Sequence, residues 1–298
     1  MLPGNRQFNE RRAALCLARE RHLILLPRKI AAPSVVAHDV PLPDDHALAA
    51  DLAERAGKLL LDLRAKGGDP KALRDAGDRQ SHEFLMAELA KSRPDDAVLS
   101  EEGTDDKARL SADRVWIVDP LDGTREFGEP GRTDWAVHVA LWARDADGSE
   151  GNLIAGAVAL PAQNRVLATD GGAGAERPDR WVGSPIRMVV SRTRASDLVK
   201  AVAARIDAEL VPCGSAGAKV AMVIMGGSDV YLHSGGFYEW DTAAPVAVAR
   251  QRGFHVSRID GSHVMYNQED PFLPDILVCR PAIAPVLLDA IREATYAI

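Results

Sequence analysis

Apolar residues recur along this chain with two spacings, and the change from one to the other predicts where helices give way to strands. Two helices are predicted by apolar positions at helical intervals. One lies at residues 43–68 and ends at a glycine pair, and the other lies at residues 77–94 and ends at Pro94. Short continuous or alternating apolar runs predict strands instead. These runs lie at residues 97–100, 114–119, 134–142, 154–161 and 164–169. The last three follow one another closely, which indicates an antiparallel sheet.

Beyond residue 170, a glycine- and proline-rich stretch at residues 171–185 predicts a loop and a candidate domain boundary. Strand-like runs then alternate with helical stretches, which is typical of β/α units. The strand-like runs lie at 186–191, 209–212, 229–233 and 275–279, and helices are expected at 195–206, after Gly217, from Trp240 and from about Ala282. We therefore expect an α+β lobe at residues 37–184 and a C-terminal α/β lobe at residues 185–298.

The start of the chain differs from the rest. Residues 11–29 are basic and hold a four-residue apolar core, Leu23 to Leu26, which is too short for a secretory signal. Convincing periodicity begins after Pro43, so residues 1–36 are expected to form a non-essential extension that is disordered in part. No apolar run approaches the length of a membrane span, so no stable membrane insertion is expected.

Composition is that of an ordinary soluble globular protein, with 46% hydrophobic and 27% charged residues among 298 positions. The formal net charge of -7 disfavours nucleic-acid polymers as partners, although it allows a small anion held by metal ions. The cysteines Cys16, Cys213 and Cys279 have no paired spacing, which favours a reducing cytoplasm.

Candidate chemistry begins where a predicted strand ends, in the sequence VWIVDPLDGTREF. Asp119 and Asp122 stand outside the end of an apolar strand, the position at which α/β proteins place their sites. Pro120 fixes one torsion and Gly123 permits a left-handed one, which favours a Leu121 carbonyl that faces the same way as the carboxylates. Two carboxylates and a carbonyl suit Mg²⁺. A turn in which the aspartates cap their own backbone is the alternative.

Further segments also place acids at the edge of a predicted element. Glu101 and Glu102 follow the strand-like AVLS. Asp241 opens the helix in EWDTAA, and Asp78 stands in DAGDRQ. Taken singly, each has an ordinary interpretation, such as a solvated loop for the glutamates and a helix N-cap for Asp241. Acids gathered from separate segments repel one another unless cations neutralise them, so the combination favours divalent metal ions.

The motifs SEEG, WIVDPLDGTREF, GSAGAK and EWDTAA occur in that order. In this combination the chain, over residues 44–292, resembles the inositol monophosphatase-like family of Mg²⁺-dependent, lithium-sensitive phosphatases. Arg125, Glu126 and Phe127, with the later YNQEDPFLPD, look most like the 3′(2′),5′-bisphosphate nucleotidases of the CysQ type. Inositol monophosphatases tend to have Thr-Asn-Phe after the threonine. The resemblance implies an α+β, mixed α/β fold: a layered αβαβα sandwich in two lobes, with the site between them.

The resemblance also implies which residues hold two or three Mg²⁺ ions. The implied ligands are four carboxylates and one carbonyl, those of Glu101, Asp119, Asp122, Asp241 and Leu121. Asp119 would bridge the two tighter ions. A third, weaker ion would lie near Glu101 and Asp78, and Glu102 is expected outside the ligand set.

For catalysis, the resemblance implies that Asp78 and the Thr124 hydroxyl orient and deprotonate the attacking water. The attack is expected to be in line and without a covalent enzyme intermediate. If Gly123 and Thr124 open a helix, their N–H groups would bind the phosphate.

Substrate contacts are implied at the small-residue turn CGSAGAK. Gly214, Ser215 and Lys219 would contact the nucleoside and its second phosphate, and Asp241 would also touch the substrate. A plain glycine loop between a strand and a helix is the alternative. Arg125 either binds that second phosphate or pairs with Glu126 on the surface.

The sequence departs from related patterns in two places. His233 and Ser234 stand where inositol monophosphatases carry a carboxylate, which disfavours inositol phosphate as the substrate. Residues 66–78 lack the Lys-x-Asp-x-Ser-Pro-Val-Thr run of many bisphosphate nucleotidases.

The expected activity is Mg²⁺-dependent removal of the 3′-phosphate from adenosine 3′,5′-bisphosphate, and from 3′-phosphoadenylyl sulfate, in sulfur assimilation. Inositol 1-phosphate and fructose 1,6-bisphosphate are the rival substrates on the same fold. A non-catalytic sensor on this scaffold would lack a member of the acid set, but every member is present. A homodimer is usual in the family and is expected here.

Overall fold

The computed structural model describes residues 45–295 except for positions 149, 170–184 and 194, and these residues belong to the compact unit of residues 37–298. The expected extension at residues 1–36 and the expected boundary near residue 184 lie outside the described residues. The division of the chain into lobes therefore stays a prediction.

One sheet is built from the first half of the chain. Its strands are β1 (Ala97–Ser100), β2 (Arg114–Asp122), β3 (Ala136–Arg144), β4 (Gly151–Leu160) and β5 (Arg165–Ala168), in that spatial order. β1 runs parallel to β2, and β2 runs antiparallel to β3. β3, β4 and β5 pair antiparallel, as the sequence predicted. β2 and β3 are buried on both faces, which explains why their apolar runs are nearly continuous.

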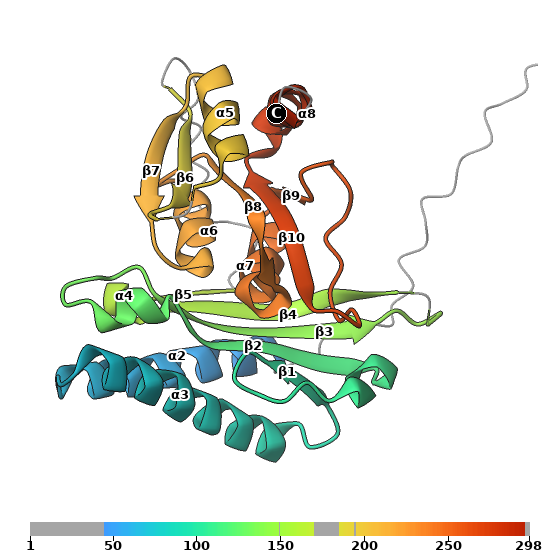
Figure 1. Cartoon of the computed structure of the whole chain (residues 1–298). Helices are drawn as coiled ribbons and strands as arrows, with labels where there is room; N and C mark the ends of the chain where they lie inside the picture. Colours follow the sequence, from blue (N-terminus) through green and yellow to red (C-terminus); the bar gives the residue numbers. More distant parts are fainter. Residues whose placement is uncertain (1–44, 149, 170–184, 194, 296–298) are drawn as a thin grey trace, which may run out of the picture. The chain divides into compact units, whose positions relative to one another are not determined.

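Helices α2 (Asp45–Ala65) and α3 (Pro70–Ser92) cover one face of this sheet (Figure 1). The buried side of α2 follows the helical period through Leu52, Ala56 and Leu60, and it packs against strand residues such as Trp116. This contact buries the side of the sheet that faces away from the second half of the chain.

The start of α3 differs from the prediction, which placed it near Gly77. The helix begins at Pro70 because the Asp69 carboxylate accepts a hydrogen bond from the N–H of Ala72 and caps the first turn. Proline fits that first helical position, since its missing N–H would have no partner there. Asp78 therefore lies within α3 rather than at its start.

A second sheet is built from the C-terminal half. Its strands are β6 (Arg187–Ser191), β7 (Glu209–Cys213), β8 (Val230–Tyr238), β9 (His255–Ser257) and β10 (Phe272–Cys279), in the spatial order β7-β6-β8-β10-β9. β6 runs parallel to β7 and to β8, whereas β10 runs antiparallel to β8 and to β9. The parallel pairs confirm the β/α alternation expected there.

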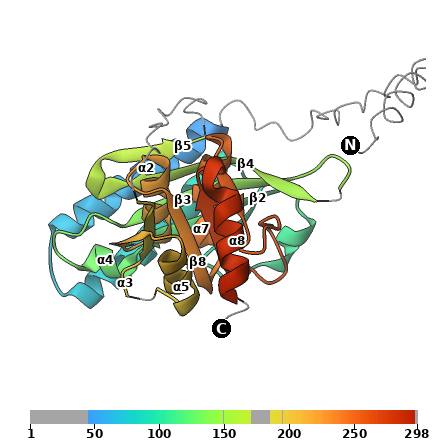
Figure 2. The same cartoon turned by 90° about the horizontal axis from the view of Figure 1, so that it is seen from above.

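Helices α6 (Ala216–Ile224) and α7 (Glu239–Gln251) lie between the two sheets, and α5 (Asp197–Arg205) and α8 (Ala284–Thr295) cover the outer face of the second sheet (Figure 1). The view from above shows α8 and α5 lying over this sheet (Figure 2). Separate apolar clusters fill the spaces between successive layers. The described residues thus form the αβαβα sandwich that the resemblance implied.

Short elements escaped the sequence analysis. They are β9 and the 3-10 helices at Lys107–Ser111, Pro161–Gln163 and Pro281–Ile283, whereas α4 (Thr124–Gly128) begins where the sequence analysis considered a helix opening. Each is too short to show a full period of apolar residues, so no pattern could reveal it.

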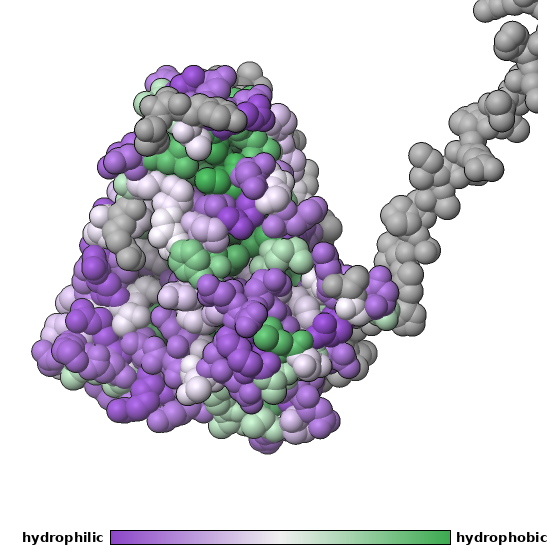
Figure 3. All heavy atoms as spheres, turned by 45° about the vertical axis from the view of Figure 1, so that its right-hand side comes forward, coloured by the Kyte–Doolittle hydropathy of each residue, from purple (hydrophilic) through white to green (hydrophobic). Residues whose placement is uncertain are grey.

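The face shown in Figure 3 is mostly hydrophilic, with smaller apolar areas between the polar side chains. Tyr238 and Phe272 are among the large apolar side chains that remain exposed. No helix in the described ranges is both long and apolar enough to cross a membrane.

Leu85→Ala tests the packing of α3 on the sheet. Leu85 is fully buried, so we expect the variant to lose about 2–5 kcal/mol of unfolding free energy in urea titrations. Leu61 on α2 is 37% exposed, and Leu61→Ala is the matched control, with an expected loss below about 1 kcal/mol. Equal losses for the two variants would contradict this packing.

Candidate active site

Asp119 and Asp122 lie within β2, which runs on to Asp122, and not outside the strand end as the sequence predicted; their side chains project to the same face because a bulge interrupts the strand between them. Asp119 lies opposite His138 of β3, and Asp122 lies opposite Ala136, so β2 has one residue more than its partner. Such a bulge reverses the alternation of side chains, and positions three apart then share a face. Both carboxylates therefore point toward the layer of α6 and α7, while Leu121 packs on the opposite side.

A compact group of possible metal ligands lies at this bulge. Asp119, Asp122 and His138 each offer one ligand atom, and these atoms lie within 4.8 Å of one another. The Glu101 carboxyl adjoins the group through a hydrogen bond with the Asp119 carboxyl. One oxygen of Asp119 also accepts the N–H of Leu121 at 2.9 Å, so the self-capping alternative holds for that oxygen.

Asp122 is held by the start of α6. Its Oδ2 accepts the Ser215 hydroxyl at 2.5 Å and the Gly217 N–H at 2.6 Å, and its Oδ1 accepts the Ala216 N–H at 3.1 Å. Carboxylates are stabilised at helix N-termini because the N–H groups there have no partner within the helix. Ser215 adopts a φ of 41°, an uncommon value for a residue other than glycine. Its hydroxyl also accepts the Ala218 N–H at 2.9 Å, so the strained residue serves both Asp122 and the cap of α6.

Asp78 and Thr124 meet where α3 passes the start of α4. The Thr124 hydroxyl lies 3.2 Å from Oδ1 of Asp78 and 3.1 Å from the carbonyl oxygen of Leu121. Gly123 precedes it with a φ of 86° and forms the N-cap of α4, so the turn has the left-handed conformation that the sequence predicted. The hydroxyl has a single proton, which it can donate to one of these oxygens at a time.

Asp241 enters from the other side of the site. α7 begins at Glu239 and its N-cap residue is Tyr238, so the N-cap alternative for Asp241 is wrong in position. Asp241 instead lies in the first turn and accepts the Tyr238 N–H at 2.7 Å. Asp122 and Asp241 both line the same cavity.

Burial and mutual repulsion shift the pKa values of most of these acids upward. Burial, with added repulsion, raises the pKa of Asp78 and of Asp241 to about 6. Part of Glu101 remains exposed, but desolvation of its carboxyl beside the other acids raises its pKa to about 7. Burial also raises the pKa of Asp119. Carboxylates that repel one another in this way fit a hard divalent cation, which would neutralise them.

Asp122 is the exception among these acids. Burial by itself raises its pKa, but the contact with His138 and its charge, the charge of Lys219 and the Ser215 hydroxyl outweigh burial and lower the pKa to about 2. Conversely, burial lowers the pKa of His138, but its contacts with Asp122 outweigh burial and raise it. Asp122 is therefore ionised at neutral pH before any cation binds.

A cavity of about 510 Å³ opens beside Asp122 and Asp241. Each residue that the sequence analysis predicted to contact substrate lines it, namely Gly123, Thr124, Arg125, Gly214, Ser215, Lys219 and Asp241. Arg192, Thr193 and the aromatic residues Tyr231, His233 and Phe237 also line it. The rings of His233 and Phe237 are stacked, with centroids 4.8 Å apart.

Several of these predicted contacts already have partners within the protein. The Lys219 ammonium is buried and donates to the carbonyls of Gly214 and Ser215 at 2.9 and 2.6 Å. Burial lowers the pKa of Lys219, although nearby acids oppose that shift. Arg125 lies 3.5 Å from the Thr193 hydroxyl.

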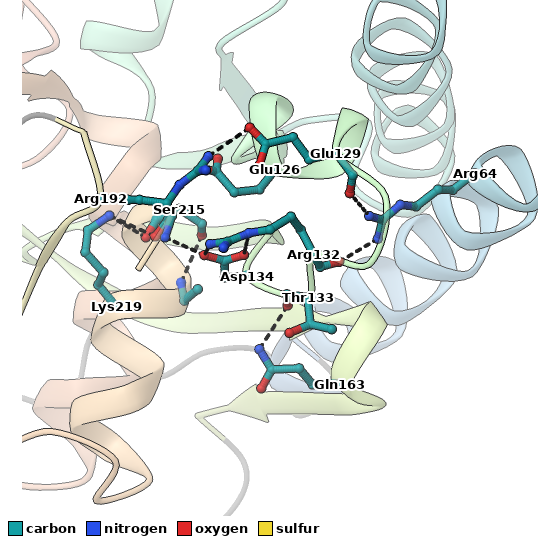
Figure 4. Close-up of polar contacts among 12 residues, drawn as sticks. Arg64, Glu126, Glu129, Arg132, Thr133, Asp134, Gln163, Arg192, Ser215 and Lys219 are labelled. Atoms are coloured by element: carbon teal, nitrogen blue, oxygen red, sulfur yellow. Dashed lines mark hydrogen bonds and ion pairs between the residues drawn. The ribbon is translucent and has the colours of Figure 1, made fainter. Parts of the chain in front are cut away.

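Glu126 is buried and pairs with Arg192 at 2.7 Å, so the predicted surface pair of Arg125 with Glu126 is replaced by this one. Arg192 also pairs with Glu129 at 3.0 Å. Figure 4 shows these contacts side by side with the turn that contains Ser215. Glu126 and Glu129 thereby link α4 and the loop after it to the end of β6.

The loop between α4 and β3 supports the start of α6 (Figure 4). Asp134 accepts the Gly214 N–H at 2.5 Å and also binds the guanidinium of Arg132. Arg64 of α2 donates to the carbonyls of Arg132 and Glu129 at 2.7 and 2.5 Å. Arg64, on an outer helix, is thus connected through three successive contacts, by way of Arg132 and Asp134, to the turn at Gly214 that holds Asp122.

Sequence reasoning missed His138, Asp134 and Arg192. The signal for His138 was a polar residue within the apolar run at residues 134–142, which a buried strand tolerates when the side chain has partners. Asp134 and Arg192 carried no pattern, because each binds residues that are far away in the sequence.

Residues 46–296 match the Inositol monophosphatase family. The chain belongs to this family. One member, the 3′-phosphoadenosine 5′-phosphate phosphatase of Mycobacterium leprae (strain TN), is 52% identical over 255 residues, which cover 84% of this chain and 94% of that protein. Another, the 3′(2′),5′-bisphosphate nucleotidase CysQ of Escherichia coli (strain K12), is 32% identical over 206 residues, 66% of this chain and 81% of that one.

Among solved structures of the family, CysQ from Bacteroides thetaiotaomicron superposes with a TM-score of 0.64 at 28% identity, covering 78% of this chain and 96% of that chain. The family and the fold expected from the ordered motifs are thereby confirmed.

The raised pKa values predict how Mg²⁺ should stabilise the protein. Between about pH 4 and pH 7 the folded, metal-free protein retains protons on Asp78, Glu101 and Asp241 that the unfolded chain has released, so its stability falls as pH rises through this window. Mg²⁺ competes with those protons. We expect the increase in Tm on adding Mg²⁺ to be small at about pH 5 and large at about pH 8. Calorimetry with and without Mg²⁺ measures it, and equal increases at both pH values would contradict this assignment.

Proposed function

We propose that this protein is a Mg²⁺-dependent phosphomonoesterase that removes the 3′-phosphate of adenosine 3′,5′-bisphosphate, and of 3′-phosphoadenylyl sulfate. The similarity to the Mycobacterium leprae phosphatase, 52% identical over 84% of this chain, is the observation that supports the substrate. The grouping of Glu101, Asp119 and Asp122 supports the chemistry, as do Asp122 and Asp241 in the cavity wall and Asp78 beside Thr124.

In this proposal Glu101, Asp119, Asp122, Asp241 and the Leu121 carbonyl hold two or three Mg²⁺ ions. Bound Mg²⁺ supplies a lower pKa for a coordinated water and positive charge for the phosphoryl oxygens and the leaving group. The donors are oxygens, and these closely placed acids repel one another without a cation, so the set fits this ion.

Asp78 and Thr124 orient the attacking water and accept its proton. With a pKa raised to about 6, Asp78 is largely ionised at neutral pH, yet it is more basic than an ordinary aspartate. The Thr124 hydroxyl can donate to the Leu121 carbonyl and leave Asp78 open to the water. Uncatalysed phosphomonoester hydrolysis is very slow, so this orientation and the charge of the site must supply a large rate enhancement.

Recognition of the nucleoside falls to the part of the cavity away from the acids. Lys219 already donates to backbone carbonyls, and Gly214 and Ser215 donate to Asp134 and Asp122. These residues therefore shape the wall, as does Arg192, which is paired with two glutamates, while Arg125 supplies positive charge for a second phosphate. The stacked rings of His233 and Phe237 provide flat apolar surface of the kind a purine base packs against.

We infer further, from the family likeness, that the enzyme acts in sulfur assimilation in the cytoplasm, without stable membrane insertion. By the same reasoning it is a homodimer and is inhibited by lithium. Cys213 and Cys279 are both buried free thiols, which agrees with a reducing compartment.

The substrate assignment predicts phosphate release from adenosine 3′,5′-bisphosphate with Mg²⁺ and none after chelation. The product should be adenosine 5′-phosphate, identified by chromatography against the 2′- and 3′-phosphate isomers. We expect kcat/KM for this substrate to exceed that for inositol 1-phosphate and fructose 1,6-bisphosphate by at least about tenfold, since those esters cannot use the base surface. A preference for either ester would refute the assignment.

Asp122→Asn tests the metal assignment. We expect kcat to fall by about 100-fold or more at saturating Mg²⁺, because the amide is a neutral and weaker ligand. The amide offers one acceptor oxygen where the carboxylate offers two, so at least one donor at the start of α6 loses its partner and Tm should also fall, and kcat is therefore compared well below Tm. Asp113→Asn is the control, since that side chain is 91% exposed on the surface. Near-normal turnover by Asp122→Asn would dispose of the proposed ligand set.

A further inference from the structure

His138 is a fully buried histidine in the middle of an apolar strand, and core packing does not explain its presence. It lies on β3 between Val137 and Val139, and its side chain is 0% exposed. An imidazole in such a place costs free energy unless its nitrogens have partners. An aliphatic side chain would fill the same space without that cost.

The partners of the ring lie on two separate elements. Nδ1 lies 3.1 Å from the carbonyl oxygen of Trp240, in the first turn of α7. Nε2 lies 3.2 Å from Oδ2 of Asp122, at the end of β2. The approach of Nε2 is an ion-pair contact rather than an aligned hydrogen bond. Asp119 is farther away, with 3.9 Å between its Oδ2 and Nδ1. The ring thus spans the distance between the Asp122 carboxylate and the residue before Asp241.

Space for the ring is provided by a glycine of α6. A Cβ atom at Gly217 would lie 2.0 Å from Nε2 of His138, far inside van der Waals contact. The Gly217 N–H donates to Asp122 at 2.6 Å, so the same residue holds the carboxylate and admits the imidazole. Strand β3, the end of β2 and the starts of α6 and α7 all meet at this ring.

We propose that His138 is a positioning residue that fixes the Asp122 carboxylate relative to the first turn of α7. The distance between the Asp122 and Asp241 carboxylates, which would hold the same metal ion, is thereby kept constant. This inference rests on the proposed metal-dependent function. The ring is assigned as a support and not as a ligand, because its two nitrogens face a carbonyl and a carboxylate, both of which accept hydrogen bonds.

The test is metal binding by the whole protein without nucleotide. Mn²⁺ is the probe, with its dissociation constant measured by calorimetry and its ligands by pulsed electron paramagnetic resonance. His138→Leu removes both nitrogens, His138→Asn keeps one amide, and Gly217→Ala displaces the ring while His138 remains. Gly227→Ala is the matched glycine control, since a Cβ there has its nearest neighbour at 3.4 Å.

We expect His138→Leu and Gly217→Ala to weaken Mn²⁺ binding by about 10- to 100-fold, the usual effect of losing a group that supports a metal ligand. His138→Asn should lose less, and Gly227→Ala should bind as the unsubstituted protein does. Gly217→Ala should cost less in the His138→Asn background, because the smaller amide leaves room for the methyl group. Bound Mn²⁺ should show no directly coordinated nitrogen.

Contrary outcomes are distinct from one another. Unchanged Mn²⁺ binding by His138→Leu would overturn the positioning role alone. If the leucine variant does not fold, unchanged binding by both His138→Asn and Gly217→Ala would overturn it in the same way. A strong ¹⁴N coupling that disappears in His138→Asn would make the ring a ligand and overturn it as well. Absence of Mn²⁺ binding by the unsubstituted protein would overturn the proposed function together with this inference.

Discussion

The hydrogen bonds between the Asp122 carboxylate and the start of α6 are the interaction on which the rest of the site depends. Asp122 belongs to the first sheet, whereas α6 follows β7 of the second, and three donors from α6 and its cap bind both carboxylate oxygens. His138, the charge of Lys219 and the Ser215 hydroxyl keep Asp122 ionised in a buried place, whereas burial raises the pKa of the neighbouring Asp119. The hydrogen bonds to Asp122 also fix where the Gly214–Ser215 turn lies, and with it the wall of the cavity.

Charge explains why the acids of the site come from separate segments of the chain. Carboxylates on neighbouring residues would repel one another in the unfolded chain as well as in the folded protein, so folding would change their pKa values little. Carboxylates on α3, β1, β2 and α7 are brought together by folding, which raises the pKa values of Asp78, Glu101 and Asp241. A bound cation would remove this repulsion. The arrangement of acids that destabilises the metal-free protein would therefore favour binding of a metal ion.

Much of this arrangement could be predicted from the sequence, because its signals are local. The apolar runs of β2 and β3, the spacing in α2, and the Asp-Pro-Leu-Asp-Gly-Thr turn all depend on residues that are close together in the chain. The true start of α3 was also locally encoded by Asp69 and Pro70, and it was missed because the neighbouring glycines suggested a loop. His138, Asp134 and Arg192 could not be found this way. Apart from the local contact between Asp134 and Arg132, their partners lie 16 to 102 residues away, and the choice among them depends on strand register and helix placement that no local pattern contains.

The position of Asp241 follows from packing more than from hydrogen bonds of its own. α7 lies between the two sheets, and the helix residues that follow Asp241 are almost all buried, several of them alanines. Small side chains let the helix approach the strands closely on both sides, and a close-packed interior resists displacement. The first turn of α7 is therefore placed by the core, and the Trp240 carbonyl in that turn binds the ring of His138. A change deep in the middle layer should accordingly alter the separation of Asp122 and Asp241 even though it touches neither carboxylate, because the core fixes one of them and the helix N-terminus fixes the other.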